Sequence, residues 1–192
     1  MQHHLGPNAP LIGIEGGRAK LSTPALILDL ASAQRNIKAM MGHCQRTNQK
    51  LRPHGKSHKS SAIAQRQIEA GALGICCATI REAETMVDKG IPGVLITSPV
   101  TSEAKIDRLV ALHQRAKNLM AVVDDSLTVA EISTTHAKYR SNNQLALLVD
   151  FDVGLQRTGA RDAHAAHDLA RRISDTEGLS FIGIQAYAGH LQ

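Results

Sequence analysis

Aromatic side chains are scarce in this sequence, which has two Phe, two Tyr and no Trp among 192 residues. Proteins that bind single-stranded nucleic acid commonly stack bases on aromatic rings. Blocks of roughly five or six like charges, which are typical of nucleic-acid-binding tails, are missing as well. Lys and Arg exceed Asp and Glu by only five, which is enough to favour anionic ligands. We therefore expect no nucleic-acid partner.

Cysteine is also rare, and long apolar runs are missing from the sequence. The three cysteines are Cys44, Cys76 and Cys77. An odd count, with two of them adjacent in an apolar stretch, indicates reduced thiols and a cytoplasmic location. No apolar run approaches the roughly 18 residues of a membrane span, and the N-terminus lacks the charged-then-apolar order of a secretory signal. We therefore expect no membrane partner.

Short apolar runs alternate with helical patterns along most of the chain, in which 43% of the residues are hydrophobic. Residues 1–21 are interpreted as an N-terminal lead-in and residues 22–192 as one domain. Runs that are apolar on both faces predict strands of a parallel sheet covered by helices. The predicted strands are residues 23–30, 50–54, 73–78, 93–97, 119–123, 145–153 and 179–187. Predicted helices between them include residues 59–70, 81–89 and 162–173.

Two α/β architectures fit the six strands that are predicted from residue 50 onward. One is a doubly wound open sheet, and the other is a (β/α)8 barrel that is two units short, since a full barrel usually takes about 250 residues. In both, functional residues gather where parallel strands end. The polar side chains at the predicted strand ends are His54, Lys56, His58, Thr79, Thr97, Ser98, Asp124, Asp150, Asp152, Arg157, Tyr187 and His190.

Lys56 is the candidate nucleophile among these side chains. A lysine at the end of a strand is partly desolvated, and here it has cationic neighbours; both effects lower the pKa of an amine. Such an amine is nucleophilic near neutral pH and forms a Schiff base with a carbonyl group. Lys59 is expected to begin the next helix and to reach solvent. The simpler alternatives are that Lys56 is an ordinary surface lysine, or that residues 52–59 form a basic nucleic-acid-binding module.

Five motifs, in order and spacing, resemble those of one enzyme family. The motifs are "TPALILDL", "LRPHGKSHK", "GALGICCATIREAE", "VDFDVGLQRTG" and "GIQAYAGH". From about Ser22 onward the chain is similar to the D-threonine aldolase and eukaryotic-type D-serine dehydratase family, which depends on pyridoxal 5'-phosphate (PLP). This family has the barrel fold of the alanine racemase N-terminal domain, so the resemblance implies a PLP-binding (β/α)8 barrel that is incomplete, with about six βα units.

The resemblance implies a role for five residues. Lys56 would form the Schiff base with PLP and act as the base at the α-carbon of the substrate. Arg157 would hydrogen-bond the phenolic oxygen of the cofactor, and Tyr187 would lie near its pyridine nitrogen. His54 and Thr79 would line the pocket near the ring.

The implied activity is that of a lyase acting on D-configured β-hydroxy amino acids. It would cleave D-threonine-like substrates to glycine and an aldehyde, or dehydrate a substrate such as D-serine. A non-catalytic PLP-binding protein on the same barrel is the alternative. The expected partner is a small-molecule D-amino acid, and the full-length form could be a homodimer.

Two parts of the family pattern are not found in the sequence. The phosphate-binding loop should follow "AYAGH", and the C-terminal β domain should carry the divalent-metal site of the family. We therefore read the chain as a truncated enzyme without a metal site of its own, and expect it alone to bind PLP weakly and to turn over little substrate.

Two pairs of side chains in the sequence are candidates for a metal site. His54 and His58 are four residues apart, but a glycine between them and the preceding strand argue against a helical metal pair. Asp150 and Asp152 could bind a divalent cation, although acidic residues at a strand end more often accept hydrogen bonds from loop amides.

Overall fold

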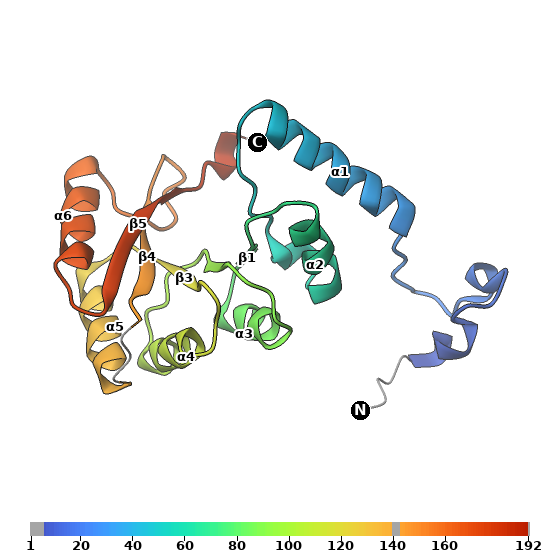
Figure 1. Cartoon of the computed structure of the whole chain (residues 1–192), viewed down its shortest axis with the longest axis horizontal. Helices are drawn as coiled ribbons and strands as arrows, with labels where there is room; N and C mark the ends of the chain where they lie inside the picture. The colour runs from blue at the N-terminus through green and yellow to red at the C-terminus, as the bar shows by residue number, and fades with distance from the viewer. Residues whose placement is uncertain (1–5, 140–142, 192) are drawn as a thin grey trace. The chain divides into compact units, whose positions relative to one another are not determined.

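The computed structural model of the chain describes residues 6–139 and 143–191 (Figure 1). The chain forms two compact units, Met1–Ala39 and Met40–Gln192. The first unit contains two short 3-10 helices, η1 (Gly6–Leu11) and η2 (Gly17–Lys20). The division of the sequence into a lead-in of residues 1–21 and a domain of residues 22–192 stays a prediction.

The segment predicted as the first strand, residues 23–30, is not a strand. Leu26 has an exposed fraction of 103%, and Ile27 and Leu28 are also exposed. A strand needs a neighbour that takes its backbone hydrogen bonds, and no strand in the described part of the chain pairs with this segment. The prediction was wrong because an apolar run indicates a preference for burial and does not supply a partner.

Helix α1 (Leu30–Arg46) begins after Asp29, whose Oδ1 accepts a hydrogen bond from the backbone N–H of Ser32 at 2.8 Å. An acidic or hydroxyl side chain at this position satisfies one of the free N–H groups of the first turn. Cys44 near the end of the helix is buried, whereas Met40, one turn earlier on the same face, is exposed.

The second unit contains a parallel sheet of five strands in the order β1-β2-β3-β4-β5. The strands confirm the five that were predicted from residue 73 onward. Their bounds are Ile75–Cys77 for β1, Val94–Ile96 for β2, Met120–Val123 for β3, Leu145–Phe151 for β4 and Leu179–Ala186 for β5.

The predicted strand of residues 50–54 is reduced to a single bridge. His54 pairs in parallel with Cys76, and the N–H of Cys76 donates to the carbonyl oxygen of Pro53 at 2.8 Å. Pro53 has no N–H with which to continue a ladder. The described sheet therefore has five strands instead of the expected six, and the segment that leads to His54 lies beside β1.

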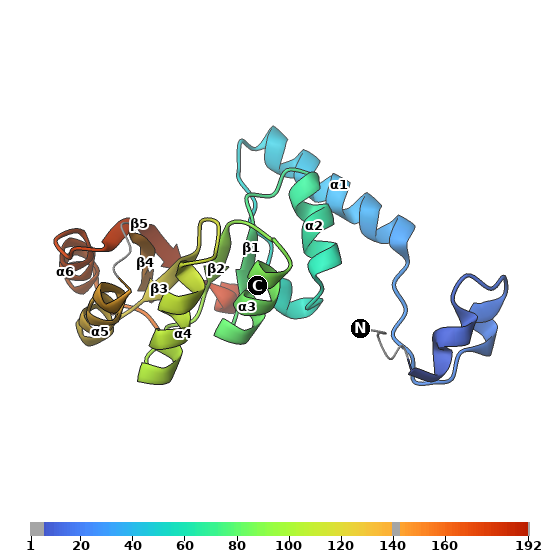
Figure 2. The ribbon, with the colours of Figure 1, turned by 60° about the horizontal axis from the view of Figure 1, so that its bottom comes forward.

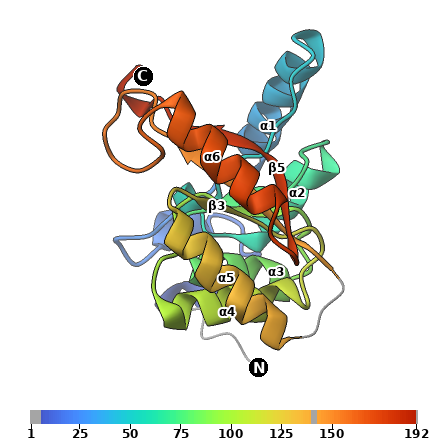
Figure 3. The ribbon, with the colours of Figure 1, turned by 90° about the vertical axis from the view of Figure 1, so that its left-hand side faces the viewer.

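Helices connect the strands and lie on one side of the sheet. In a sheet where each strand pairs with the next one along the chain, right-handed crossovers place all connecting helices on the same face. Figures 2 and 3 show α4, α5 and α6 lying side by side against the strands. A doubly wound sheet would reverse its strand order and carry helices on both faces, so this arrangement is that of a barrel. The helices are α2 (Ser61–Glu69), α3 (Ile80–Asp88), α4 (Glu103–His113), α5 (Ser126–Lys138) and α6 (Ala163–Ser174).

The hydrophobic core lies between the strands and these helices. Leu145, Leu147 and Val149 of β4 are buried in it, and the alternate residues Ala146 and Leu148 are half-buried. This alternation follows from the two-residue repeat of a strand, which points successive side chains to opposite faces. The second face of the sheet is the one that lines the interior of a barrel.

Helices α3 and α5 begin at side chains that cap them, and these caps lie at the same edge of the sheet as the strand ends. Thr79 Oγ1 accepts from the N–H of Glu82 at 3.2 Å at the start of α3, and Asp125 Oδ1 accepts from two amides at 2.9 Å at the start of α5. Strand β5 ends the described sheet and pairs only with β4, so it forms an edge of the described sheet. None of the described helices is long and apolar enough to cross a membrane.

Candidate active site

The candidate residues are brought together by the edge where the parallel strands end. His54 lies beside β1, and Lys56 follows in the short 3-10 helix η3 (Gly55–Ser57). Arg157 lies in the segment between β4 and α6, and Tyr187 directly follows β5. Segments that are up to about a hundred and thirty residues apart in sequence thus meet at one end of the sheet, as parallel strands require.

Tyr187 lies between two cationic side chains. The Lys56 Nζ atom is 6.0 Å from the centre of the Tyr187 ring, and the guanidinium carbon of Arg157 is 5.1 Å from it. Both distances fall within the range over which a cation is attracted to an aromatic face. The structure therefore places Lys56, Arg157 and Tyr187 near one another.

The expected partial desolvation of Lys56 is not found. Lys56 and Arg157 are both exposed, and the exposed fraction of Tyr187 is 40%. The side chain of Lys56 extends beyond the end of the sheet, where the described segments leave it open to solvent. The part of the prediction that placed this amine in a partly dry environment is wrong for the described chain.

His54 is held in a defined tautomer by the segment that leads to Lys56. Its Nδ1 accepts a hydrogen bond from the N–H of Lys56 at 3.2 Å, so its Nε2 carries the proton and donates to Thr97 Oγ1 at 3.1 Å. The hydroxyl of Thr97 in turn donates to the carbonyl oxygen of Cys77 at 3.2 Å. Burial, followed by the charge of Lys56, lowers the pKa of His54 below its ordinary value of 6.5. In this tautomer the His54 ring accepts a hydrogen bond from the backbone at Lys56 and donates one to Thr97.

The two neighbouring lysines have different surroundings. Lys59 precedes α2 and forms an ion pair with Glu82, and Glu82 Oε2 also accepts from the N–H of Ala78 at 2.8 Å. Within the residues that the structure describes, Lys56 has no ion pair. An amine that is engaged with a carboxylate is a poorer nucleophile than one that is not. This difference favours Lys56 over Lys59 as the reactive lysine.

Arg157 is carried by a segment, residues 152–160, that three aspartates hold in place. Asp152 Oδ1 accepts from the N–H groups of Gly154 and Gln156, both at 2.9 Å, and these amides, that of Gln156 first, lower the pKa of Asp152. Asp124 Oδ2 accepts from the N–H of Gly159 at 3.2 Å. The guanidinium of Arg157 thus projects from an ordered turn.

The third aspartate, Asp150, is buried beneath the same segment, with an exposed fraction of 3%. Its Oδ2 accepts from the hydroxyl of Thr158 at 2.7 Å, and its Oδ1 accepts from Nε2 of Gln185 at 2.8 Å. Asp152 therefore accepts hydrogen bonds from loop amides, as is usual for an acidic residue at a strand end, whereas Asp150 accepts from a loop hydroxyl and from a side chain of β5. In the described chain no group of three His, Cys, Asp or Glu side chains is arranged to hold a metal ion.

The hydrogen bond of the Thr79 side chain is made with the start of α3 and not with another candidate residue. Thr79 is exposed, and its hydroxyl oxygen caps α3. Its predicted place near the cofactor ring remains a prediction. Sequence reasoning also missed Gln185, whose only signal was its position two residues before Tyr187, on the same face of β5 by strand periodicity.

The cysteines near this edge are not reactive groups. Burial, the largest cause, raises the pKa of Cys77 to about 12 and also raises the pKa of Cys76. Cys77 is fully buried in β1. The interpretation of this pair as strand residues, with at least one in the core, is confirmed.

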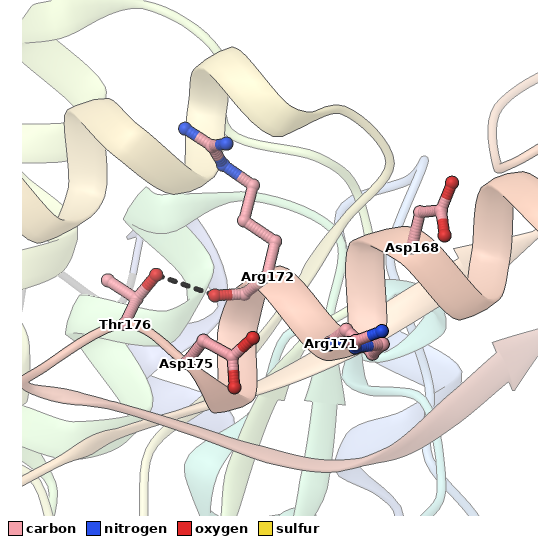
Figure 4. A pocket seen from close by; sticks show the side chains of 5 residues that line it. All are labelled: Asp168, Arg171, Arg172, Asp175 and Thr176. Atoms are coloured by element: carbon pink, nitrogen blue, oxygen red, sulfur yellow. Dashed lines mark hydrogen bonds between the residues drawn. The ribbon is translucent and has the colours of Figure 1, made fainter.

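One surface pocket lies away from the candidate site, at the C-terminal end of α6 (Figure 4). It is formed by one face of this helix and the turn that follows, where the hydroxyl of Thr176 donates to the carbonyl oxygen of Arg172 at 2.6 Å. None of its lining residues is among the candidates from the strand ends. Its lining residues are Asp168, Arg171, Arg172, Asp175 and Thr176.

The fold and the residues at this edge are those of a (β/α) barrel protein. Comparison with known proteins identifies the family to which this barrel belongs. Residues 28–192 match the family model of the alanine racemase N-terminal domain. The chain belongs to this family. This result confirms the barrel that the sequence resemblance implied and excludes the doubly wound alternative.

The names of similar proteins refer to D-configured hydroxy amino acids. The chain is 38% identical over 174 residues to the D-threonine aldolase of an Arthrobacter species and 35% identical over 175 residues to the 3-hydroxy-D-aspartate aldolase of Paracoccus denitrificans (strain Pd 1222). Each alignment covers 91% of this chain and 45% of the relative. The chain therefore spans less than half the length of these curated relatives.

Solved structures give the same result. The crystal structure of D-threonine aldolase from Filomicrobium marinum matches with a TM-score of 0.86 and 38% identity, over 91% of this chain and 46% of that chain. D-threo-3-hydroxyaspartate dehydratase from Delftia sp. HT23 matches with a TM-score of 0.80 and 27% identity, over 88% of this chain and 44% of that chain. Alanine racemase from E. faecalis, at 21% identity, shares the fold with a TM-score of 0.64.

Proposed function

We propose that this chain is the cofactor-bearing part of a PLP-dependent lyase that acts on D-configured β-hydroxy amino acids. The observation that carries the proposal is the meeting of Lys56, Arg157 and Tyr187 at the end of the sheet, with Lys56 Nζ 6.0 Å from the Tyr187 ring. The names of similar proteins, two aldolases and a dehydratase of hydroxy amino acids, support the choice of substrate class. Retro-aldol cleavage and dehydration are both compatible with this site.

The side chains at this edge have the chemistry that PLP requires. A primary amine, a guanidinium and a phenol lie close together, at Lys56, Arg157 and Tyr187, and the imidazole of His54 accepts a hydrogen bond from the N–H of Lys56. When bound, PLP supplies an aldehyde with which an amine condenses and a conjugated ring that takes up electron density from the α-carbon of the substrate. The donor set therefore fits the cofactor.

Each residue has a proposed task. Lys56 would hold the cofactor covalently, and its amine would take or return the proton at the α-carbon of the substrate. Arg157 would place a fixed positive charge beside the phenolic oxygen of the cofactor, where charge complementarity strengthens a hydrogen bond. Tyr187 would lie near the pyridine nitrogen as a neutral partner. His54 and Thr79 would line the pocket.

The proposal extends to the whole protein of which this chain forms part. The substrate would be a small D-amino acid, with no nucleic acid or membrane as partner, and the enzyme would be cytoplasmic. The complete enzyme would also use a divalent metal ion that is bound outside this chain, and it could be a homodimer.

A labelling experiment tests the proposal. The chain is incubated with PLP, reduced with borohydride and digested, and the labelled lysine is located by mass spectrometry. We expect the label on Lys56, its loss in Lys56→Ala, and its retention in the matched variant Lys59→Ala, because Lys59 is paired with Glu82. A label that is found mainly on Lys59, or one that is spread evenly over surface lysines, would contradict the proposal.

A further inference from the structure

A polar network connects the segments that carry the candidate residues. Its members are Thr158, Asp150, Gln185, Thr97 and His54. Gln185 is its centre, because Nε2 of this side chain donates to Asp150 Oδ1 at 2.8 Å and to the carbonyl oxygen of Thr97 at 3.1 Å. The network thus joins the end of β4 to the end of β5 and to the residue after β2.

Each end of the network stands beside a residue of the proposed site. Thr158 directly follows Arg157, and Gln185 is two residues before Tyr187. His54 is two residues before Lys56 and holds its N–H. None of the network residues takes part in the cation–π contacts of Lys56, Arg157 and Tyr187. The network therefore acts on these three side chains through the backbone that carries them.

Asp150 is the member whose loss would be least tolerated. It is buried, and both of its oxygens are used, one toward the Arg157 segment and one toward β5. A buried side chain that accepts hydrogen bonds from two different segments fixes their separation, because both segments must stay within hydrogen-bond distance of the same group and its removal costs both bonds. A helix or turn cap contacts only its own segment, whereas Asp150 contacts both the segment of Arg157 and strand β5.

We infer that Asp150 is a positioning residue that sets the distance between Arg157 and Tyr187, and through Gln185 and Thr97 their register with Lys56. One consequence of this inference rests on the proposed function: PLP should bind more weakly when the network is broken. The geometric part concerns Tyr187 alone and does not need the cofactor.

Tyrosine fluorescence measures the geometric part. The chain has no Trp and two Tyr, so in a Tyr139→Phe background Tyr187 is the only fluorescent tyrosine. Quenching by neutral acrylamide then reports how freely solvent reaches the Tyr187 ring. We expect Asp150→Ala to increase the quenching constant by about twofold, because a released Arg157 segment uncovers the ring.

PLP labelling of Lys56 measures the consequence. At subsaturating PLP, we expect Asp150→Ala to lower the labelled fraction of Lys56 roughly tenfold, the loss typical of removing a hydrogen bond to a buried charged group. Asp150→Asn should restore most of the labelling, because an amide oxygen still accepts from Gln185 and the amide nitrogen can donate to Thr158. This recovery would not be expected if the negative charge itself were required.

Asp125→Ala is the matched control. Asp125 is also an aspartate at a strand end and accepts hydrogen bonds from two amides, but it caps α5 and has no link to Arg157 or Tyr187. It should lower stability while leaving both Tyr187 quenching and Lys56 labelling unchanged. If Asp150→Ala does not fold, two other variants are available: Thr158→Val breaks the link to Asp150, and Gln185→Met breaks the links to Asp150 and to Thr97. Both are expected to change quenching and labelling in the same direction, with the smaller change in Thr158→Val.

The outcomes separate the two proposals. If the native chain does not label at Lys56, yet Tyr187 quenching depends on Asp150 and not on Asp125, the proposed function fails and the positioning role stands. Equal quenching and equal labelling in the Asp150 and Asp125 variants would overturn the positioning role while leaving the function intact.

Discussion

The guanidinium carbon of Arg157 lies 5.1 Å from the centre of the Tyr187 ring, although the two residues come from different strand ends. Arg157 follows β4 and Tyr187 follows β5, and these strands pair in parallel with Asp150 opposite Gln185. The contact therefore depends on the register of two neighbouring strands.

Replacing Arg157 should loosen this contact and weaken cofactor binding. Arg157→Gln removes the charge and the cation–π attraction, so we expect acrylamide quenching of Tyr187 to rise in the Tyr139→Phe background and PLP labelling of Lys56 to fall about tenfold, as expected for the loss of a charge-assisted hydrogen bond. Arg157→Lys keeps the charge and should lose less. Arg161→Gln is the control, because Arg161 pairs with Asp152 and has no contact with the ring; equal effects in the two glutamine variants would speak against this role of Arg157.

Removing the cap of α3 should destabilise the chain. Thr79 Oγ1 accepts from the N–H of Glu82 at 3.2 Å, so Thr79→Ala should lower the free energy of unfolding by about 1 kcal/mol. Ser102→Ala is a matched control, because Ser102 precedes α4 without a side-chain capping hydrogen bond. Chemical denaturation followed by circular dichroism measures both. The assignment fails if the two variants lose the same stability.

Two neighbouring leucines of β4 should respond differently to truncation. Leu147 is fully buried in the core between sheet and helices, and Leu148 points to the other face and is half-buried. Leu147→Ala should lower the free energy of unfolding by about 3 kcal/mol, whereas Leu148→Ala should lose clearly less. A larger loss in Leu148→Ala would mean that the opposite face of β4 is the one against the helices.

Stability should fall on acidification through His113. Burial is the largest cause that lowers the pKa of His113 below 6.5; its Nε2 lies 3.1 Å from the carbonyl oxygen of Asn143, and its ring centre is 5.5 Å from that of His136. The folded state prefers the neutral ring, so the unfolded state binds more protons below pH 6.5. This contribution is therefore complete above pH 6.5 and is lost as the pH falls.

Urea denaturation between about pH 7 and pH 5 measures this dependence. We expect a shallower loss of stability in His113→Gln than in the native chain. His164→Gln is the control, because His164 is largely exposed on α6, with a side-chain exposure of 87%. An unchanged slope in His113→Gln would show that other groups carry the pH dependence.

Much of the barrel was predictable from local sequence. The runs at residues 73–78, 93–97, 119–123, 145–153 and 179–187 are strands because each is apolar on both faces and is followed by a helix start. The two failures, at residues 23–30 and 50–54, have one origin. An apolar run does not show whether a neighbouring strand is there to pair with it, and at residues 50–54 Pro53 also removes a ladder donor.

The identity of the candidate site residues could be predicted from the sequence, but their surroundings could be predicted only in part. Lys56 was predicted from its place at a strand end, Arg157 and Tyr187 received their roles from the family motifs, and the structure brings all three to one edge. The prediction that Lys56 is partly desolvated was wrong, because desolvation depends on what covers a side chain in the fold. Gln185 was missed for a related reason, since its partners Asp150 and Thr97 are contributed by other strands.

The amino-acid sequence alone determined the alternation of strands and helices, the caps at the helix starts and the identity of the reactive lysine candidate, because each of these depends on side chains that are near in sequence. Only the tertiary structure decided the parallel order of the five strands, the tautomer of His54, and the buried position of Asp150 between Thr158 and Gln185. These features depend on contacts between segments that are distant in the chain, and local preferences carry no information about such contacts.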